Sequence, residues 1–138
     1  MTPGTILFDK QFQFKDGEVG RKLLVVLSDG KTGFYLIIKT TSQSKFKGRD
    51  EGCQSNDRYP NFYLPDGTTC LQGESWLILN EFYELDAAEL DKKVADGEIS
   101  RIGNLPRDVL IELFDCAINC WDISTKQADI LREIMPSL

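Results

Sequence analysis

Histidine is absent from this chain of 138 residues. Its absence excludes Ser-His-Asp hydrolases, Cys-His proteases and the histidine-based ribonuclease mechanisms. Glycine-rich phosphate loops of the P-loop or Rossmann type are also missing. Any catalysis must therefore use lysine, arginine, carboxylates, tyrosine, hydroxyls or thiols.

Long apolar runs are missing too. No stretch approaches the ~18 apolar residues that a membrane-spanning helix needs. The N-terminal residues do not show the basic region followed by an apolar stretch that is typical of a signal peptide. We therefore expect a cytoplasmic protein without a membrane partner.

The cysteines do not form a metal-binding pattern. There is no CxxC pair among the four, so neither a metal nor another cofactor is expected. Cys116 and Cys120 are one helical turn apart and are interpreted as small buried apolar residues. A bridge between Cys53 and Cys70 is geometrically possible, but a reducing compartment disfavours it.

Charge is unevenly distributed along the chain. The net charge is −6, which alone argues against a nucleic-acid partner. Residues 1–50, however, hold nine Lys and Arg against five acids, a net of +4, whereas the remainder carries seven against seventeen, a net of −10. This asymmetry favours a basic face in the N-terminal part and an acidic helical flank, the alternative being an ordinary solvated surface.

Two apolar runs, residues 23–27 and 34–38, stand on either side of a Ser-Asp-Gly turn cluster. Their composition predicts strands that are buried on both faces. Arg21 and Lys22 enter the first strand, and Lys39 and Thr40 leave the second. Because the chain reverses between the strands, we expect these polar ends to lie close together. Cations facing hydroxyls there would form a binding site for a phosphate group.

The remaining pattern predicts further strands and then helices. Residues 5–9, 61–64 and 75–80 are expected strands, whereas residues 41–61 are interpreted as a long polar loop. After Asp86 the apolar period changes to about 3.6, which predicts helices over 86–95, 105–120 and 124–135. Ser124 and Gln127 have the spacing of a capping box. The predicted class is α+β, mainly β with C-terminal helices.

Several segments in this order resemble the MazF/PemK toxin family. They are Gly4-Thr5-Ile6-Leu7 with a following Phe-x-Phe, the R-K-L-L-V-V-L strand, the strand ending in K-T-T-S-Q-S-K, the Trp76 strand and the helix at 105–120. The resemblance covers roughly residues 4–120. It implies one domain over residues 1–138, with a polar insertion around 46–73 and an additional C-terminal helix around 124–135.

The resemblance also implies a fold and a function. The fold would be a small SH3-like β-barrel of the MazF, PemK and CcdB type. The chain would be the toxin of a toxin–antitoxin system, a metal-independent endoribonuclease that cleaves single-stranded RNA such as mRNA. The implied partners are single-stranded RNA, an antitoxin protein and a second copy of the chain in a homodimer.

By position in the family pattern, the catalytic threonine corresponds to Thr40 and the catalytic arginine corresponds to Lys22. The family has Arg-Pro where this chain has Lys22-Leu23, and lysine supplies one mobile charge instead of a planar pair of donors. Three alternatives follow. Lys22 acts electrostatically or as a general acid, Arg21 turns inward through a bulge, or the site is inactive.

A cluster of polar residues after the second long strand is interpreted as a track for the RNA backbone, with a solvated loop as the alternative. Its members are Lys39, Thr41, Lys45, Lys47 and Arg49. The alternative function is a catalytically inactive barrel of the same fold that binds a protein, either as a gyrase poison or as a structural partner.

Overall fold

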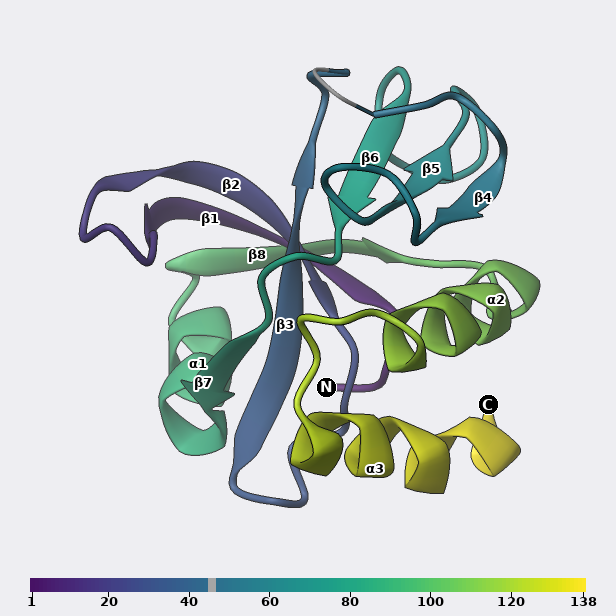
Figure 1. Ribbon diagram of the computed structural model, residues 1–138. Helices are drawn as coiled ribbons and strands as arrows, with labels where there is room; N and C mark the ends of the chain where they lie inside the picture. Colours follow the sequence, from purple (N-terminus) through teal and green to yellow (C-terminus); the bar gives the residue numbers. More distant parts are fainter. Residues whose placement is uncertain (45–46) are drawn as a thin grey trace.

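The computed structural model describes residues 1–44 and 47–138, and it is a mainly antiparallel sheet with helices in the C-terminal half (Figure 1). All the strand pairs in this part of the chain are antiparallel, which confirms the predicted fold class. The strands are β1 (Thr5–Gln13), β2 (Val19–Val26), β3 (Phe34–Thr41), β4 (Gly52–Gln54), β5 (Asn61–Leu64), β6 (Ser75–Ile78), β7 (Tyr83–Asp86) and β8 (Ile99–Asn104).

Strand β3 is shared by two parts of the sheet. Residues 34–37 pair with β7, residues 37–39 pair with β2, and Thr40 and Thr41 pair with β6. The order along the sheet is β4-β5-β6-β3-β2-β1-β8. The end of β3 is therefore the place where the N-terminal hairpin meets the β4–β6 part.

Side-chain caps mark the starts of the first and third helices, as the sequence predicts. Helix α1 (Ala87–Ala95) begins after Asp86, whose side chain accepts a hydrogen bond from the Glu89 backbone. Helix α2 (Arg107–Ile118) follows Pro106, and α3 (Thr125–Ile134) begins with the predicted capping box of Ser124 and Gln127. A short 3-10 turn, Met135–Ser137, follows α3. None of the helices in the described part of the chain is long and apolar enough to cross a membrane.

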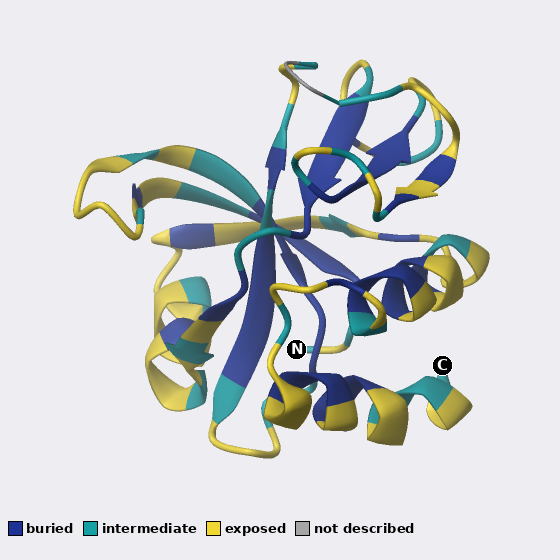
Figure 2. Cartoon of the chain, viewed as in Figure 1, coloured by how far each residue is buried: buried dark blue, intermediate teal, exposed yellow. Residues whose placement is uncertain are grey.

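Apolar residues bury both faces of the central strands, as their continuous apolar runs predict. One cluster joins Val25, Leu36 and Ile38 to residues of α2 and α3. The second joins Leu24 and Ile37 to Leu90 of α1. Figure 2 shows the resulting buried band along β3, with exposed residues at the hairpin tips. The sheet is therefore held between α1 on one side and the α2–α3 pair on the other.

The segment predicted as a long loop contains two features that the sequence did not indicate. Strand β4 lies within it and pairs with β5, and a disulfide joins Cys53 of β4 to Cys116 of α2. The expected role of Cys116 as a free buried residue was therefore wrong, whereas Cys120 is a buried thiol. Cys70 is a free, exposed thiol rather than the partner of Cys53. The bridge depends on the packing of α2 against β4, which no local pattern encodes.

Candidate functional site

Lys22 lies in a cavity of about 330 Å³ next to the place where the pairing of β2 with β3 ends, and the sequence predicted a phosphate-binding site there. Strand alternation explains why Lys22 faces this cavity together with Lys39. Leu24 is the register partner of Lys39, so the two share a face, and Lys22 lies two residues from Leu24 on the same face. The lining consists of Lys22, Lys39, Thr41, Gln43, Lys47, Tyr59, Ile78, Asn80 and Glu81.

Lys22 is partly buried and has lysines around it. Burial lowers the pKa of its ammonium, and the positive charges of Lys39 and Lys47 lower that pKa further. Within the described residues, no carboxylate lies within ion-pair distance of the Lys22 ammonium. A partly buried cation without a counter-ion, beside two further cations, is suited to bind an anion.

Glu81 fixes the position of Lys39 in the same cavity. The Lys39 Nζ is 3.0 Å from Glu81 Oε2, and the Tyr83 hydroxyl donates to that carboxylate over 2.9 Å. Burial disfavours the charge on Glu81, but hydrogen bonds from Lys39 and Tyr83 outweigh it and hold its pKa below the ordinary value. The same carboxylate and burial raise the pKa of Tyr83 to about 12. Glu81 therefore stays ionised and orients one of the three lysines.

Arg21 and Thr40 lie on the opposite face of the sheet from Lys22. They line a second hollow of about 360 Å³ with Leu23 and Ser75, and Lys22 and Thr41 line this hollow as well as the first cavity. Thr40 is buried and Arg21 is exposed. The irregularity in this hairpin lies in β1, between Asp9 and Phe12. Lys22 is therefore brought together with Thr41 more closely than with Thr40.

The predicted RNA-binding residues are divided between the cavity and its surroundings. Lys39, Thr41 and Lys47 line the cavity. Arg49 is exposed and forms an ion pair with Glu74 over 2.9 Å, so its charge is already partnered. Lys45 lies outside the described residues.

Sequence reasoning did not place Asn80 in the site. Its Oδ1 is buried without a hydrogen-bond partner in the part of the chain that the structure describes. A signal was present, because Asn80 and Glu81 come directly after an apolar strand and so lie at a strand end. Tyr59, by contrast, comes from a polar segment whose path no pattern predicts.

A metal has no evident place in this site. Among residues 1–44 and 47–138, no group of three or more Cys, Asp or Glu side chains is arranged to hold a metal ion. The cavity's polar groups are ammonium groups, a threonine hydroxyl, a carboxylate and two side-chain amides, and Tyr59 adds an aromatic ring.

Comparison with known proteins gives a structural match and no sequence match. No protein-family model matches the chain, and no curated protein matches it. Among solved structures, the chain is similar to MazE-MazF (Form-III) from Deinococcus radiodurans, with a TM-score of 0.51 and 19% identity over 85% of this chain and 92% of that one. The chain therefore has a MazF-like fold, which confirms the fold that the resemblance implied.

Proposed function

We propose that this protein is the toxin of a toxin–antitoxin system, a metal-independent endoribonuclease that cleaves single-stranded RNA at the Lys22 cavity. The observation that carries the proposal is the partly buried Lys22 ammonium, which has no counter-ion among the described residues and shares one cavity with Lys39 and Lys47. The MazF-like fold supports it independently.

The chemistry requires no metal. The 2′-oxygen of a ribose bonds to the adjacent phosphorus, its proton leaves to solvent, and the bond from phosphorus to the 5′-oxygen breaks. The products are a 2′,3′-cyclic phosphate and a 5′-hydroxyl. Lys22 stabilises the charge that builds up on the phosphate oxygens and donates a proton to the leaving 5′-oxygen. Its lowered pKa favours that proton transfer.

Thr41 is the hydroxyl on the Lys22 face of β3, and we assign it a contact to the same phosphate. To Thr40 and Arg21, which line the second hollow, we assign a contact to the neighbouring part of the RNA. These roles make Lys22 the main catalytic residue and Thr40, Thr41 and Arg21 secondary ones.

The partner we propose is an antitoxin whose acidic segment occupies the lysine-lined cavity. The structural neighbour is a complex of MazE with MazF, which supports a partner of this kind. We also propose a homodimer, one domain over the whole chain and a cytoplasmic location.

The test is RNA cleavage by purified protein in the presence of EDTA, with the ends of the products identified. We expect 2′,3′-cyclic phosphate ends and a loss of about 10²–10³-fold in rate for Lys22→Ala, the usual cost of removing one electrostatic donor. Lys22→Arg should retain only the electrostatic part of the activity, because arginine keeps its charge but does not give up a proton to the leaving oxygen.

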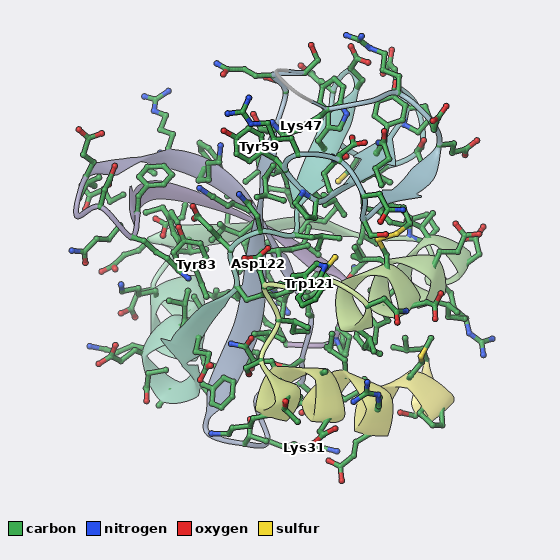
Figure 3. The ribbon with its side chains drawn as sticks, viewed as in Figure 1. Lys31, Lys47, Tyr59, Tyr83, Trp121 and Asp122 are labelled. Carbon is green, nitrogen blue, oxygen red and sulfur yellow. A yellow bond between two sulfur atoms is a disulfide. The ribbon has the colours of Figure 1, made fainter. Side chains whose placement is uncertain are left out.

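The matched control is Lys31→Ala, since the Lys31 side chain is 86% exposed and lies at the opposite end of the molecule from Lys47 (Figure 3). Intact RNA after incubation with folded wild-type protein would overturn the proposal that the protein is a nuclease. Growth arrest on expression, with a bound protein and undegraded RNA, would then select the protein-binding alternative.

A further inference from the structure

The Lys22 cavity has an outer wall that the cleavage chemistry does not use. Tyr59 and Lys47 form this wall, and both belong to the β4–β5 segment, defined here as residues 47–64. The Lys47 Nζ is 5.6 Å from the centre of the Tyr59 ring, and Figure 3 shows the two side chains next to each other. An aromatic ring and a cation therefore line the same cavity as the residue proposed to act on the phosphate.

A polar network holds this wall in place. Asn61 is fully buried, and its amide donates to the Tyr59 carbonyl over 2.9 Å and to Asp57 over 3.2 Å. Gln54 donates to the Asn61 Oδ1 over 3.0 Å. These bonds fix the backbone of Tyr59 from inside the segment, so the ring's position follows from the fold.

Lys47 is held through its neighbour Gly48. The Gly48 amide donates to Asp57 over 2.9 Å, and the Gly48 carbonyl accepts a hydrogen bond from the fully buried Trp76 over 2.7 Å. A methyl group at Gly48 would meet the end of the Gln54 side chain, which would have to move away from this close approach. The wall is thus anchored to β6, the strand that pairs with the end of β3.

The size and chemistry of the cavity suit one nucleotide. Its volume of about 330 Å³ is at the lower end of the range of ~300–1,000 Å³ for small-molecule sites. Bases of single strands stack on aromatic rings, and lysines neutralise the phosphates between them. Lys47 is close enough to Lys22 to lower its pKa, so a ligand at the wall and a phosphate at Lys22 would be adjacent.

We propose that Tyr59 and Lys47 form a nucleotide subsite in which a base of single-stranded RNA stacks on Tyr59 while Lys47 binds the neighbouring phosphate. The inference rests on the proposed function, because it places this base next to the cleaved phosphate. The Asn80 carboxamide lies on the same lining. The β4–β5 segment is therefore a substrate-binding part of the molecule.

The experiment compares the binding of two short single-stranded 2′-deoxy oligonucleotides that are equal in length and charge, one with bases and one abasic. Neither has the 2′-hydroxyl that cleavage needs, so binding is measured whether or not the protein is a nuclease. We expect the base-bearing strand to bind wild-type protein about 5- to 150-fold more tightly, the equivalent of one stacked base. Tyr59→Leu should remove most of this ratio, and Tyr59→Trp should keep it.

Two further variants separate stacking from charge. Lys47→Ala should weaken both strands alike and lower the slope of log affinity against log salt by about 0.7. Trp121→Leu is the aromatic control, because Trp121 is 95% exposed and does not line the cavity. It should leave the ratio unchanged.

The outcomes distinguish this subsite from the nuclease itself. An unchanged ratio in folded Tyr59→Leu protein, or no binding of either strand by wild type, would overturn the subsite even if RNA is cleaved. A ratio that falls in Tyr59→Leu protein while RNA stays intact would uphold the subsite and overturn the nuclease.

Discussion

The β4–β5 segment and the rest of the sheet are stabilised in different ways. Strands β1, β2 and β3 are held by apolar side chains packed on both faces against three helices. The β4–β5 segment also packs Phe62 and Leu64 into the apolar core, but it adds a disulfide and hydrogen bonds among polar side chains such as Gln54, Asp57 and Asn61. Both parts contribute to one cavity, Lys22 from the first and Tyr59 from the second.

This difference shows that one site can combine two kinds of support, an apolar scaffold that carries Lys22 and a hydrogen-bonded wall that carries Tyr59. The apolar scaffold places Lys22 and Lys39 by strand register, which tolerates substitutions that preserve the apolar pattern. The wall depends on individual hydrogen-bond partners, so single polar substitutions should move it. The following predictions test that contrast.

Removing the disulfide should have the largest effect. A bridge between residues 63 positions apart restricts the unfolded chain, and its loss in Cys53→Ser/Cys116→Ser protein should cost about 4 kcal/mol. Urea unfolding measures the loss, and hydrogen exchange should accelerate most in β4 and β5. Cys70→Ser, at an exposed free thiol, is the control. Thiol titration that finds all four cysteines free in the native protein would contradict the bridge.

A cavity created in the apolar scaffold should lower the free energy of unfolding slightly less than loss of the disulfide does, but it should affect the whole molecule. Leu36 is fully buried in β3, the strand shared by both parts of the sheet. Leu36→Ala should lower the free energy of unfolding by about 3 kcal/mol, and exchange should accelerate in both parts. Ile111→Ala, at a side chain that is 37% exposed, should cost less than about 1 kcal/mol. Acceleration confined to β3 and its partner β2 would refute the shared role.

The same contrast explains what the sequence allowed us to predict of the fold. The apolar runs located β2 and β3, and the spacing of Ser124 and Gln127 located the start of α3, because each signal is local. The start of β2 was missed by four residues. Val19 joins the strand by pairing with Gln13 of β1, and cross-strand pairing extends a hairpin whatever the polarity of its residues.

The site was predictable to the extent that strand geometry determines it. Reversal of the chain brought Lys22 and Lys39 together, as expected. Alternation places Lys22 and Thr40, which the family resemblance had paired, on opposite faces of the sheet, although both line the second hollow. The buried Asn61 amide holds the backbone of Tyr59 beside the cavity by a hydrogen bond. A network of polar side chains of this kind leaves no periodic signal in the sequence.

Two asparagines offer a test with an intermediate effect. Asn61 bonds with Gln54, Asp57 and the Tyr59 carbonyl, so Asn61→Leu leaves buried polar groups unpaired and should cost about 2 kcal/mol. The Asn80 Oδ1 has no partner within the described residues, so Asn80→Leu should change stability by less than about 0.5 kcal/mol or increase it. Paired urea titrations compare them. Equal losses would show that the network does not support the β4–β5 segment.

Lys22 should show the smallest effect, and the effect should be stabilising. Its pKa is lowered in the folded protein by burial first and then by Lys39 and Lys47, so the unfolded chain binds this proton more tightly. The charge therefore costs stability at neutral pH, and the cost disappears as pH rises through the range between the lowered pKa and the ordinary lysine value. Solvent screens the exposed half of the side chain, so Lys22→Met should gain less than about 1 kcal/mol.

The gain from Lys22→Met should shrink with rising pH, because the wild-type lysine then loses its charge while methionine is unaffected. Unfolding titrations of both proteins at neutral and alkaline pH measure this difference. Lys31→Met, at an exposed side chain, should show no comparable trend. A variant that gains stability while losing RNA cleavage would show that the scaffold holds Lys22 at a cost for the sake of the anion it binds. A destabilised Lys22→Met protein would instead mean that Lys22 has a structural role in the sheet.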